Sequence, residues 1–365
     1  MARRLLTGLL GLTVLGSGAA WWLTRRPLAY AERTDSPAVG DPRPAPAAAH
    51  PTPQPSESDA PAPIALPAQA TAPATRTRRG PPPRFARTAN YLLVGIDGSR
   101  GRALGRADTL ILAVFDDASG HVGFVSVPRD LYVEIPDHGP NRINATLRVA
   151  AKLRKDPLDL VRDVTATALA VPIQHVVAVD LGVFEEGIDR LGGLTIDVPC
   201  PIDDNFIDRR TESGRRPLRV AAGRQRMDGV TVAMYARSRH GRSDWDRARR
   251  HQAIIAALHD RAGELGADVW LPIALDSLER GVITSMSRLQ MMSLARRVAA
   301  IDREKMHGVV IGTRQTEIHW TDERQAVLVP RYDDVDDLMA GLFSAPAPGV
   351  RPAGKRCPDA DVAIP

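Results

Sequence analysis

The chain has 365 residues, of which 44% are hydrophobic and 25% are charged, so it can form one large or two ordinary domains. Residues 1–89 hold 11 Lys and Arg against 5 Asp and Glu, which leaves 37 (48 − 11) against 38 (43 − 5) for the remainder. The pI near 9.5 therefore reflects the N-terminal part. A near-neutral remainder argues against nucleic-acid binding, which needs a basic domain face.

The N-terminal segment predicts export. Residues 5–23 are uncharged and mostly apolar, with an arginine pair on each side. A helix of this length would span roughly 28 Å, close to the thickness of a hydrocarbon core. We expect residues 1–26 to be a membrane anchor that places the remainder outside the cytoplasm. A cleaved signal peptide is the alternative, because small residues precede Trp21.

Composition changes twice along the rest of the chain. Residues 27–83 contain half of all the prolines, so we expect a disordered linker over residues 27–87. A folded domain is expected over residues 88–344, followed by an irregular tail over residues 345–365. The only two cysteines, Cys200 and Cys357, either form a disulfide in an exported protein or remain free thiols.

Within the domain, short aliphatic and β-branched runs alternate with amphipathic segments. Strands are predicted at 91–96, 110–115, 122–127, 176–179, 194–198 and 309–311. Helices are predicted at about 145–170 with a break near Asp156-Pro157, and at 184–191, 227–235, 247–261 and within 271–301. The alternation predicts an α/β fold, a layered α-β-α domain with a central mixed sheet.

Arginines and aspartates recur in four separated segments, which are Gly95–Arg100, Arg106–Asp108, Pro128–Asp130 and Arg237–Arg247. A guanidinium pairs with phosphate oxygens through two parallel hydrogen bonds. Carboxylates hold a hard cation such as Mg²⁺ that bridges the same oxygens. Together these residue types predict a site for a pyrophosphate and its metal ion. The membrane segment indicates that this phosphate is carried by a lipid.

In their order and spacing, these segments resemble the LytR-CpsA-Psr family of cell-envelope phosphotransferases over residues 90–258. The resemblance implies transfer of a glycopolymer phosphate from a polyprenyl-pyrophosphate carrier to a sugar hydroxyl of peptidoglycan, with Mg²⁺ or Mn²⁺ as cofactor. The expected partners are the lipid-linked donor, the peptidoglycan acceptor and the membrane. Two alternatives remain, a hydrolase that uses water as acceptor and a non-catalytic envelope regulator.

The resemblance also implies the roles of Asp97, Asp108 and the arginines of the site, while those of Asp244 and His251 follow from their positions in the sequence. The expected metal ligands are Asp97 and Asp108. The expected pyrophosphate ligands are Arg106, Arg129, Arg237, Arg239, Arg247, His251 and Gln252. The residues expected to take part in catalysis are Arg129, Arg237, Arg239 and Asp244.

Several assignments have alternatives. Asp244 is either a helix cap or a base near the acceptor hydroxyl. His251 stands where the family has glutamine, and is either a phosphate ligand with mild pH dependence near neutrality or a surface residue. Arg237 and Arg239 would face one side in an extended segment. Arg142 replaces a common lysine, and its role is open. The apolar elements form either a polyprenyl tunnel or an ordinary core.

Overall fold

The computed structural model describes residues 85–97, 105–208, 211–239, 243–350 and 357. The expected membrane anchor and most of the expected linker lie outside these ranges. Among the described residues, no helix combines the length and the apolar composition needed to span a membrane.

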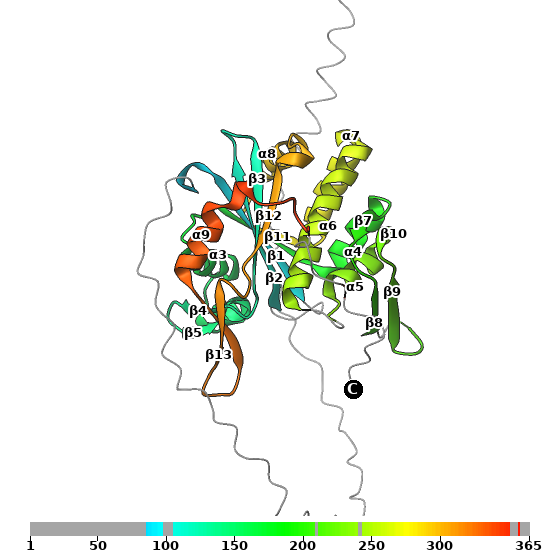
Figure 1. The fold of residues 1–365 in the computed structure, drawn as a ribbon. Coiled ribbons are helices and arrows are strands. Elements are labelled where there is room, and N and C mark those ends of the chain that lie inside the picture. The colour runs from blue at the N-terminus through cyan, green and yellow to red at the C-terminus, as the bar shows by residue number, and fades with distance from the viewer. Residues whose placement is uncertain (1–84, 98–104, 209–210, 240–242, 351–356, 358–365) are drawn as a thin grey trace, which may run out of the picture. The chain divides into compact units, whose positions relative to one another are not determined.

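A six-stranded mixed sheet forms the centre of the domain (Figure 1). Its strands are β1 (Ala89–Asp97), β2 (Arg106–Asp116), β3 (His121–Val127), β6 (His175–Asp180), β11 (Val282–Thr284) and β12 (Met306–Val310). The order is β11-β6-β1-β2-β3-β12, and β1 pairs antiparallel with β2 but parallel with β6. The predicted central mixed sheet is therefore confirmed.

Helices cover both faces of the sheet, because alternate residues of each strand point to opposite sides. On β1, Leu92 and Val94 belong to one core, whereas Tyr91 and Leu93 pack into another. The first face carries α2 (Thr146–Leu153), α3 (Pro157–Leu169) and α9 (Tyr332–Ala340). The second carries α4 (Leu181–Arg190), α6 (Asp244–Leu265), α7 (Ala267–Arg280) and α8 (Arg288–Ala299). Figure 1 shows the resulting α-β-α layers.

The helix break that the sequence predicts has a clear local cause. The side chain of Asp156 accepts hydrogen bonds from the backbone N–H groups of Leu158 and Asp159, both at 2.9 Å. Pro157 follows as the first helical residue, where its missing N–H costs nothing. The predicted boundary between α2 and α3 is confirmed.

Pairs of short strands lie outside the central sheet, and the sequence analysis missed most of them. They are β4 (Tyr132–Ile135) with β5 (Gly139–Arg142), β7 (Leu194–Val198) with β10 (Gly223–Met227), β8 (Ile202–Ile207) with β9 (Arg215–Val220), and β13 (Thr316–Trp320) with β14 (Ala326–Pro330). Charged and polar residues interrupt these strands, so their apolar periodicity is weak. Helix α5 (Gly229–Arg237) precedes the segment that leads into α6.

The ends of the folded part differ from the expected boundaries. Phe85 is only 1% exposed and belongs to the core, so the domain begins before residue 88. Cys200 and Cys357 form a disulfide with their Cα atoms 5.6 Å apart. Of the two alternatives for the cysteines, the structure supports the disulfide, which ties the C-terminal segment to the connection between β7 and β8.

Candidate active site

A cavity of about 290 Å³ lies where β2 begins, β3 ends and α6 begins. Its charged and imidazole lining comes from Asp108, Arg129, Asp130, Asp244, Arg247 and His251. These side chains meet because β2 and β3 are neighbours in the sheet and α6 packs against β3. We call this space the arginine cavity.

Asp108 occupies a β-bulge. Gly95 of β1 pairs with Thr109 of β2. The next residue, Ile96, pairs with Ala107, so Asp108 is an extra residue with no partner in β1. A bulge interrupts the alternation of side chains and re-aims the extra residue. Ala107 is accordingly buried, while the Asp108 side chain is 29% exposed and lines the arginine cavity.

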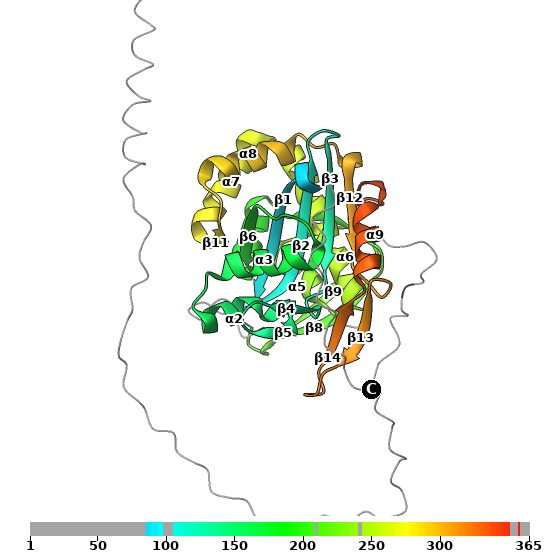
Figure 2. The same cartoon turned by 90° about the vertical axis from the view of Figure 1, so that its left-hand side faces the viewer.

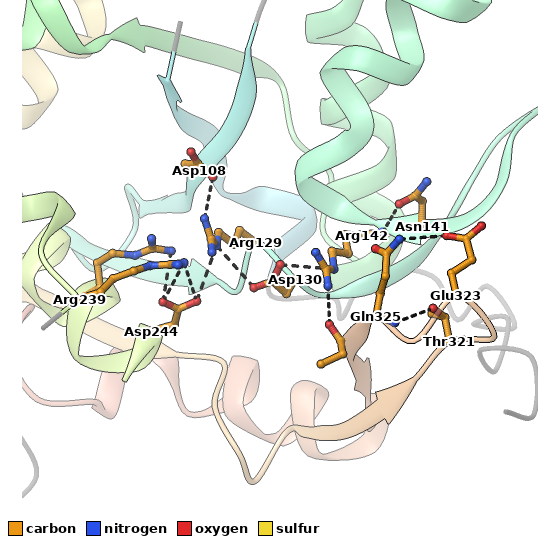
Figure 3. A network of polar contacts seen from close by, with 12 residues as sticks. Asp108, Arg129, Asp130, Asn141, Arg142, Arg239, Asp244, Thr321, Glu323 and Gln325 are labelled. Atoms are coloured by element: carbon orange, nitrogen blue, oxygen red, sulfur yellow. Dashed lines mark hydrogen bonds and ion pairs between the residues drawn. The ribbon is translucent and has the colours of Figure 1, made fainter. Parts of the chain in front are cut away.

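Arg129 lies at the centre of an ion-pair network (Figure 3). Its Nη1 donates to Oδ1 of Asp108 at 3.0 Å. Its Nε lies 3.5 Å from a carboxylate oxygen of Asp130 and 3.7 Å from one of Asp244. The Nε–H is nevertheless buried without a hydrogen-bond partner among the described residues. An anion in the cavity would satisfy this donor, and leaving it unsatisfied costs free energy.

Asp244 is the first residue of α6 and faces three guanidiniums. It lies 3.3 Å from Arg239, 3.7 Å from Arg129 and 3.8 Å from Arg247. The helix cap is Ser243 instead, whose hydroxyl accepts a backbone N–H of the first turn at 3.3 Å. The interpretation of Asp244 as the cap is therefore wrong. Its carboxylate gathers arginines from three separate segments at one point.

Arg247, in the first turn of α6, is the most deeply buried charge of the network. Its side chain is 11% exposed. Burial lowers its pKa, and the neighbouring carboxylate of Asp244 opposes this effect. Because a buried guanidinium needs an anionic partner, this position favours a negatively charged ligand.

The network carries an excess of positive charge. Its four arginines are Arg129, Arg142, Arg239 and Arg247, and its three aspartates are Asp108, Asp130 and Asp244. The balance is +1 (4 − 3) at neutral pH. A multiply charged anion such as a pyrophosphate would both offset this excess and supply acceptors for the unpaired N–H groups.

His251 lies one helical turn after Arg247 and lines the same cavity. Its Nε2 donates to the carbonyl of Ala236 at 2.9 Å, and the hydroxyl of Thr109 lies 3.4 Å from its Nδ1. Burial and the positive charge of Arg247 lower its pKa to about 3. The imidazole is therefore neutral near pH 7, and the expected pH dependence near neutrality is wrong.

Gln252 points away from the arginine cavity. It is 1% exposed, and its amide nitrogen donates to Ser126 at 2.9 Å and to the carbonyl of Val309 at 2.7 Å. Its carbonyl oxygen accepts from the backbone of Gly349 at 3.4 Å. The side chain thus joins β3, β12 and the C-terminal segment. The structure does not bring it to the other predicted pyrophosphate ligands.

Two of the predicted arginines lie at the rim of the site. Arg106 is exposed at the start of β2, opposite Asp97 in the strand register. Arg237 ends α5, and its guanidinium lies 5.6 Å from the ring centre of Phe206 on β8. Because Arg237 is helical, it does not alternate with Arg239 along an extended strand as the sequence suggested. Only Arg239 of this pair reaches the network.

The proposed metal ligands come from adjacent strands. Asp97 ends β1, but its side chain lies outside the described part of the structure, as does Arg100. The described residues contain no group of three or more His, Cys, Asp or Glu that could hold a metal ion. The Asp108 carboxylate beside a cavity for phosphate has the hard oxygen chemistry that Mg²⁺ prefers. The Asp108 side chain is therefore compatible with the ion, and the Asp97–Asp108 pair stays a prediction.

Two residues that the sequence analysis did not single out complete the cavity. Trp245 lines it, and its indole N–H is buried without a hydrogen-bond partner among the described residues. Thr109 reaches His251 from β2, opposite Gly95. A Cβ at Gly95 would lie 2.9 Å from the Cβ of Thr109, so glycine is needed there. The sequence offered one signal, the position of Trp245 between Asp244 and Arg247.

A second cavity, of about 680 Å³, lies on the same face of the sheet near α6, α7 and α8. Its lining is mostly apolar and includes Tyr91, Leu93, Ala113, Phe115, Phe124 and Trp270. On β2, Thr109 and Ile111 line the arginine cavity, while Ala113 and Phe115 line this one. Alternate residues of a strand share one face, so the two cavities follow one another along β2. We call the second one the apolar cavity.

Known proteins resemble this chain at low identity. It is 26% identical over 182 residues to the polyisoprenyl-teichoic acid–peptidoglycan teichoic acid transferase TagT of Bacillus subtilis, covering 49% of this chain and 54% of TagT. It is likewise 26% identical over 186 residues to the regulatory protein MsrR of Staphylococcus aureus (strain COL), covering 50% of this chain and 52% of MsrR. The chain thus spans about half the length of these curated relatives.

The fold is also found among solved structures. The crystal structure of B. subtilis TagV superimposes with a TM-score of 0.57 at 23% sequence identity, covering 71% of this chain and 96% of TagV. At this identity the likeness concerns the fold. The family model of the LytR_cpsA_psr family matches residues 71–335, well over half of the chain, and the protein belongs to that family.

Proposed function

We propose that this protein transfers a glycopolymer phosphate from a polyprenyl-pyrophosphate carrier to a sugar hydroxyl of peptidoglycan. One observation carries the proposal, the succession of the arginine cavity and the apolar cavity along one face of the sheet. A lipid pyrophosphate has the same two parts in the same order, a charged head and a long apolar tail. The printed name of TagT, a polyisoprenyl-teichoic acid transferase, supports the same class of donor.

The apolar cavity would hold the prenyl chain. Its volume of about 680 Å³ falls within the range of typical ligand sites, roughly 300–1,000 Å³. Rings and aliphatic side chains from β1, β2 and β3 form its floor, and helices α4, α6, α7 and α8 supply most of the other walls. A branched hydrocarbon buried there loses contact with water, which stabilises binding in proportion to the apolar area removed. The apolar elements were expected to form either a polyprenyl tunnel or an ordinary core. The presence of the apolar cavity supports the first of these interpretations.

The arginine cavity would hold the pyrophosphate. Arg129, Arg239 and Arg247 already converge on Asp244. Phosphate oxygens would take over part of these contacts and accept from the N–H donors of Arg129 and Trp245, which have no hydrogen-bond partner in the described part of the chain. Phosphoryl transfer depends mainly on positioning and on neutralising charge, both of which guanidiniums can supply.

The reaction requires one bond to form and one to break. An oxygen of the acceptor sugar attacks the phosphorus on the sugar side of the pyrophosphate. The bond from this phosphorus to the bridging oxygen breaks, and polyprenyl phosphate leaves with the electron pair. The proton of the acceptor hydroxyl passes to the carboxylate of Asp244, whose side chain is 40% exposed at the cavity. His251 stays neutral because its pKa lies at about 3, and it positions the first turns of α6 through Ala236.

Asp97 and Asp108 would hold a Mg²⁺ ion at the entry of β2. When bound, the ion would neutralise charge on the pyrophosphate oxygens. Asp108 has a second task that needs no metal, because it accepts the hydrogen bond that orients Arg129. The proposed function also implies that the N-terminal segment anchors the protein in the membrane, with this domain outside the cytoplasm.

A reconstituted reaction tests the proposal. The full-length protein would be mixed with a lipid-linked glycan donor, peptidoglycan and Mg²⁺, and the products identified by mass spectrometry. Glycan-phosphate attached to peptidoglycan, together with free polyprenyl phosphate, is the expected result. A glycan-phosphate with no acceptor attached would instead identify a hydrolase that uses water. An unchanged donor would contradict both.

The regulator alternative has one observation in its favour, the printed name of MsrR. A purely regulatory protein would catalyse no reaction, so the arginine cavity would have no catalytic role. The reconstituted reaction separates this alternative from the transferase, since a regulator would leave the lipid-linked donor intact.

A further inference from the structure

The β13–β14 hairpin exposes large apolar side chains beside the arginine cavity. Ile318 is 63% exposed and Trp320 is 54% exposed, although both belong to an ordered strand. Exposed tryptophan on a surface next to a reaction site is costly in water unless a ligand or partner covers it. The hairpin contributes to the wall of the arginine cavity, but no step of the proposed reaction uses Trp320.

The strand register places Trp320 on the cavity side of the hairpin. Ile318 pairs with Leu328, and Trp320 pairs with Ala326. Directly paired residues of antiparallel strands share a face, as do residues two apart. Ile318, Leu328 and Ala326 line the arginine cavity, together with the buried Val327 from the other face of β14. Trp320 therefore continues that wall outward, toward the hairpin tip.

The hairpin is attached to the phosphate-binding network itself. The backbone N–H of Leu328 donates to the carbonyl of Asp130 at 3.0 Å. Arg142 donates from Nη2 to the carbonyl of Ala326 at 2.8 Å, and its Nε lies 3.5 Å from the Asp130 carboxylate (Figure 3). The tip is held as well, since Gln325 receives a 3.0 Å hydrogen bond from the backbone of Thr321. These hydrogen bonds fix the position of the hairpin relative to Arg129.

The hairpin and the apolar cavity extend from the arginine cavity in opposite directions. Along β2 the apolar cavity lies toward Phe115, whereas the arginine cavity lies toward Asp108. Figures 1 and 2 agree that α8 and the hairpin occupy opposite ends of the domain. In phosphoryl transfer the attacking and leaving oxygens lie roughly in line. If polyprenyl phosphate leaves toward the apolar cavity, the acceptor hydroxyl approaches from the hairpin side.

We propose that Ile318 and Trp320 form the subsite for the acceptor glycan, with a sugar ring of peptidoglycan stacked on the Trp320 indole. This inference rests on the proposed function. The face of an indole is electron-rich and attracts the partly positive C–H groups on the apolar face of a pyranose. Residues 316–330 carry one Arg against three Asp and Glu, a net charge of −2 (1 − 3). The hairpin thus does not continue the cationic phosphate site, and its recognition surface is apolar and aromatic.

Four forms of the full-length protein in detergent test the subsite, namely wild type, Trp320→Ala, Trp320→Phe and a control, Leu289→Ala. Leu289 is 79% exposed on α8, far from the hairpin. Initial rates would be measured against acceptor concentration at saturating donor, and against donor concentration at saturating acceptor. We expect Trp320→Ala to raise the acceptor KM about tenfold or more, the scale of one aromatic contact. The donor KM and the thermal midpoint should not change.

The other variants complete the pattern. Trp320→Phe keeps an aromatic face and should stay within about threefold of wild type, since most of the stacking area remains. Leu289→Ala should match wild type. An acceptor KM for Trp320→Ala within twofold of wild type overturns the inference. A raised donor KM with an unchanged acceptor KM also overturns it, because the donor glycan would then occupy the hairpin.

A second readout separates this inference from the proposed function. Saturation-transfer NMR would detect binding of a soluble peptidoglycan disaccharide in the absence of any donor. If wild type made no transfer product but bound the disaccharide, and Trp320→Ala abolished that binding, the subsite would stand while the proposed reaction failed. Equal binding by both proteins would count against the subsite whatever the outcome of the transfer assay.

Discussion

Arg129 donates a hydrogen bond of 3.0 Å to Asp108, and this contact joins the end of β3 to the bulge of β2. Asp108 therefore has two separable tasks. Its oxygen orients the Arg129 guanidinium, and its negative charge suits a metal ion bound to the pyrophosphate. The two tasks respond differently to substitution.

Asp108→Asn should keep an oxygen that accepts from Arg129 but lose the charge. We expect a higher Mg²⁺ concentration for half-maximal rate and a loss of turnover of about tenfold to a hundredfold, the scale of a charged hydrogen bond. Asp108→Ala removes both tasks and should lose more. Rates measured across a Mg²⁺ titration check both variants.

Asp116→Asn is the matched control, because Asp116 ends the same strand far from the arginine cavity. It should retain the wild-type Mg²⁺ dependence. If Asp108→Asn and Asp116→Asn gave the same titration curve, the assignment of Asp108 as a metal ligand would be wrong.

The sequence predicted the fold class, five of the six strands of the central sheet and most of the charged network. It succeeded there because long apolar strands have a strong period and because arginine and aspartate segments are distinctive. It missed β11, which lies within the predicted helical segment 271–301. It did not predict β13–β14, since a strand such as Thr316–Trp320 alternates apolar residues with Glu317 and His319. Nor could it identify the bulge at Asp108, which depends on the pairing register with β1.

Side-chain direction was the other limit. His251 and Gln252 are neighbours in sequence, yet one lines the arginine cavity and the other joins β3 to β12. Adjacent helical residues point about 100° apart, so only one of them faces the cavity. A family motif written as consecutive residues does not carry this distinction.

The apolar cavity offers a test of donor length. Ala113 is 3% exposed on the face of β2 that lines it. Ala113→Phe should fill part of the cavity and weaken binding of a donor with a long prenyl chain, while a donor with a short chain should bind nearly as in wild type. The short-chain donor serves as the internal control for folding and for the arginine cavity. Equal loss with both donors would show that the substitution disturbed the site rather than the cavity.

His251 should make stability depend on pH. Its pKa is about 3 in the folded protein, compared with about 6.5 in the unfolded chain. Between these values the unfolded state binds more protons, so stability falls as the pH falls below about 6.5. We expect wild type to lose up to about 2 kcal/mol more than His251→Gln between pH 7 and pH 5.

Urea denaturation at the two pH values measures this difference. His138→Gln, at an exposed turn residue, is the control and should follow wild type. An identical pH dependence in wild type and His251→Gln would mean that the imidazole does not stay neutral in the folded protein.

Arg237 and Arg239 are two residues apart, but the structure predicts different responses to lysine. Arg239 lies 3.3 Å from Asp244 within the network, whereas Arg237 stacks at 5.6 Å over Phe206. Lysine keeps the charge but loses the planar fork that contacts phosphate through two hydrogen bonds. Arg239→Lys should therefore lower kcat/KM by about tenfold to a hundredfold, equivalent to roughly 1–3 kcal/mol of transition-state stabilisation.

Arg237→Lys should have a smaller effect on kcat/KM. Phe206→Leu should cause a loss similar to that of Arg237→Lys, because both substitutions remove the same stacking contact. Steady-state rates of the three variants check the order. Equal and large losses in both lysine variants would place Arg237 on the phosphate as well, and would require it to leave Phe206 when the donor binds.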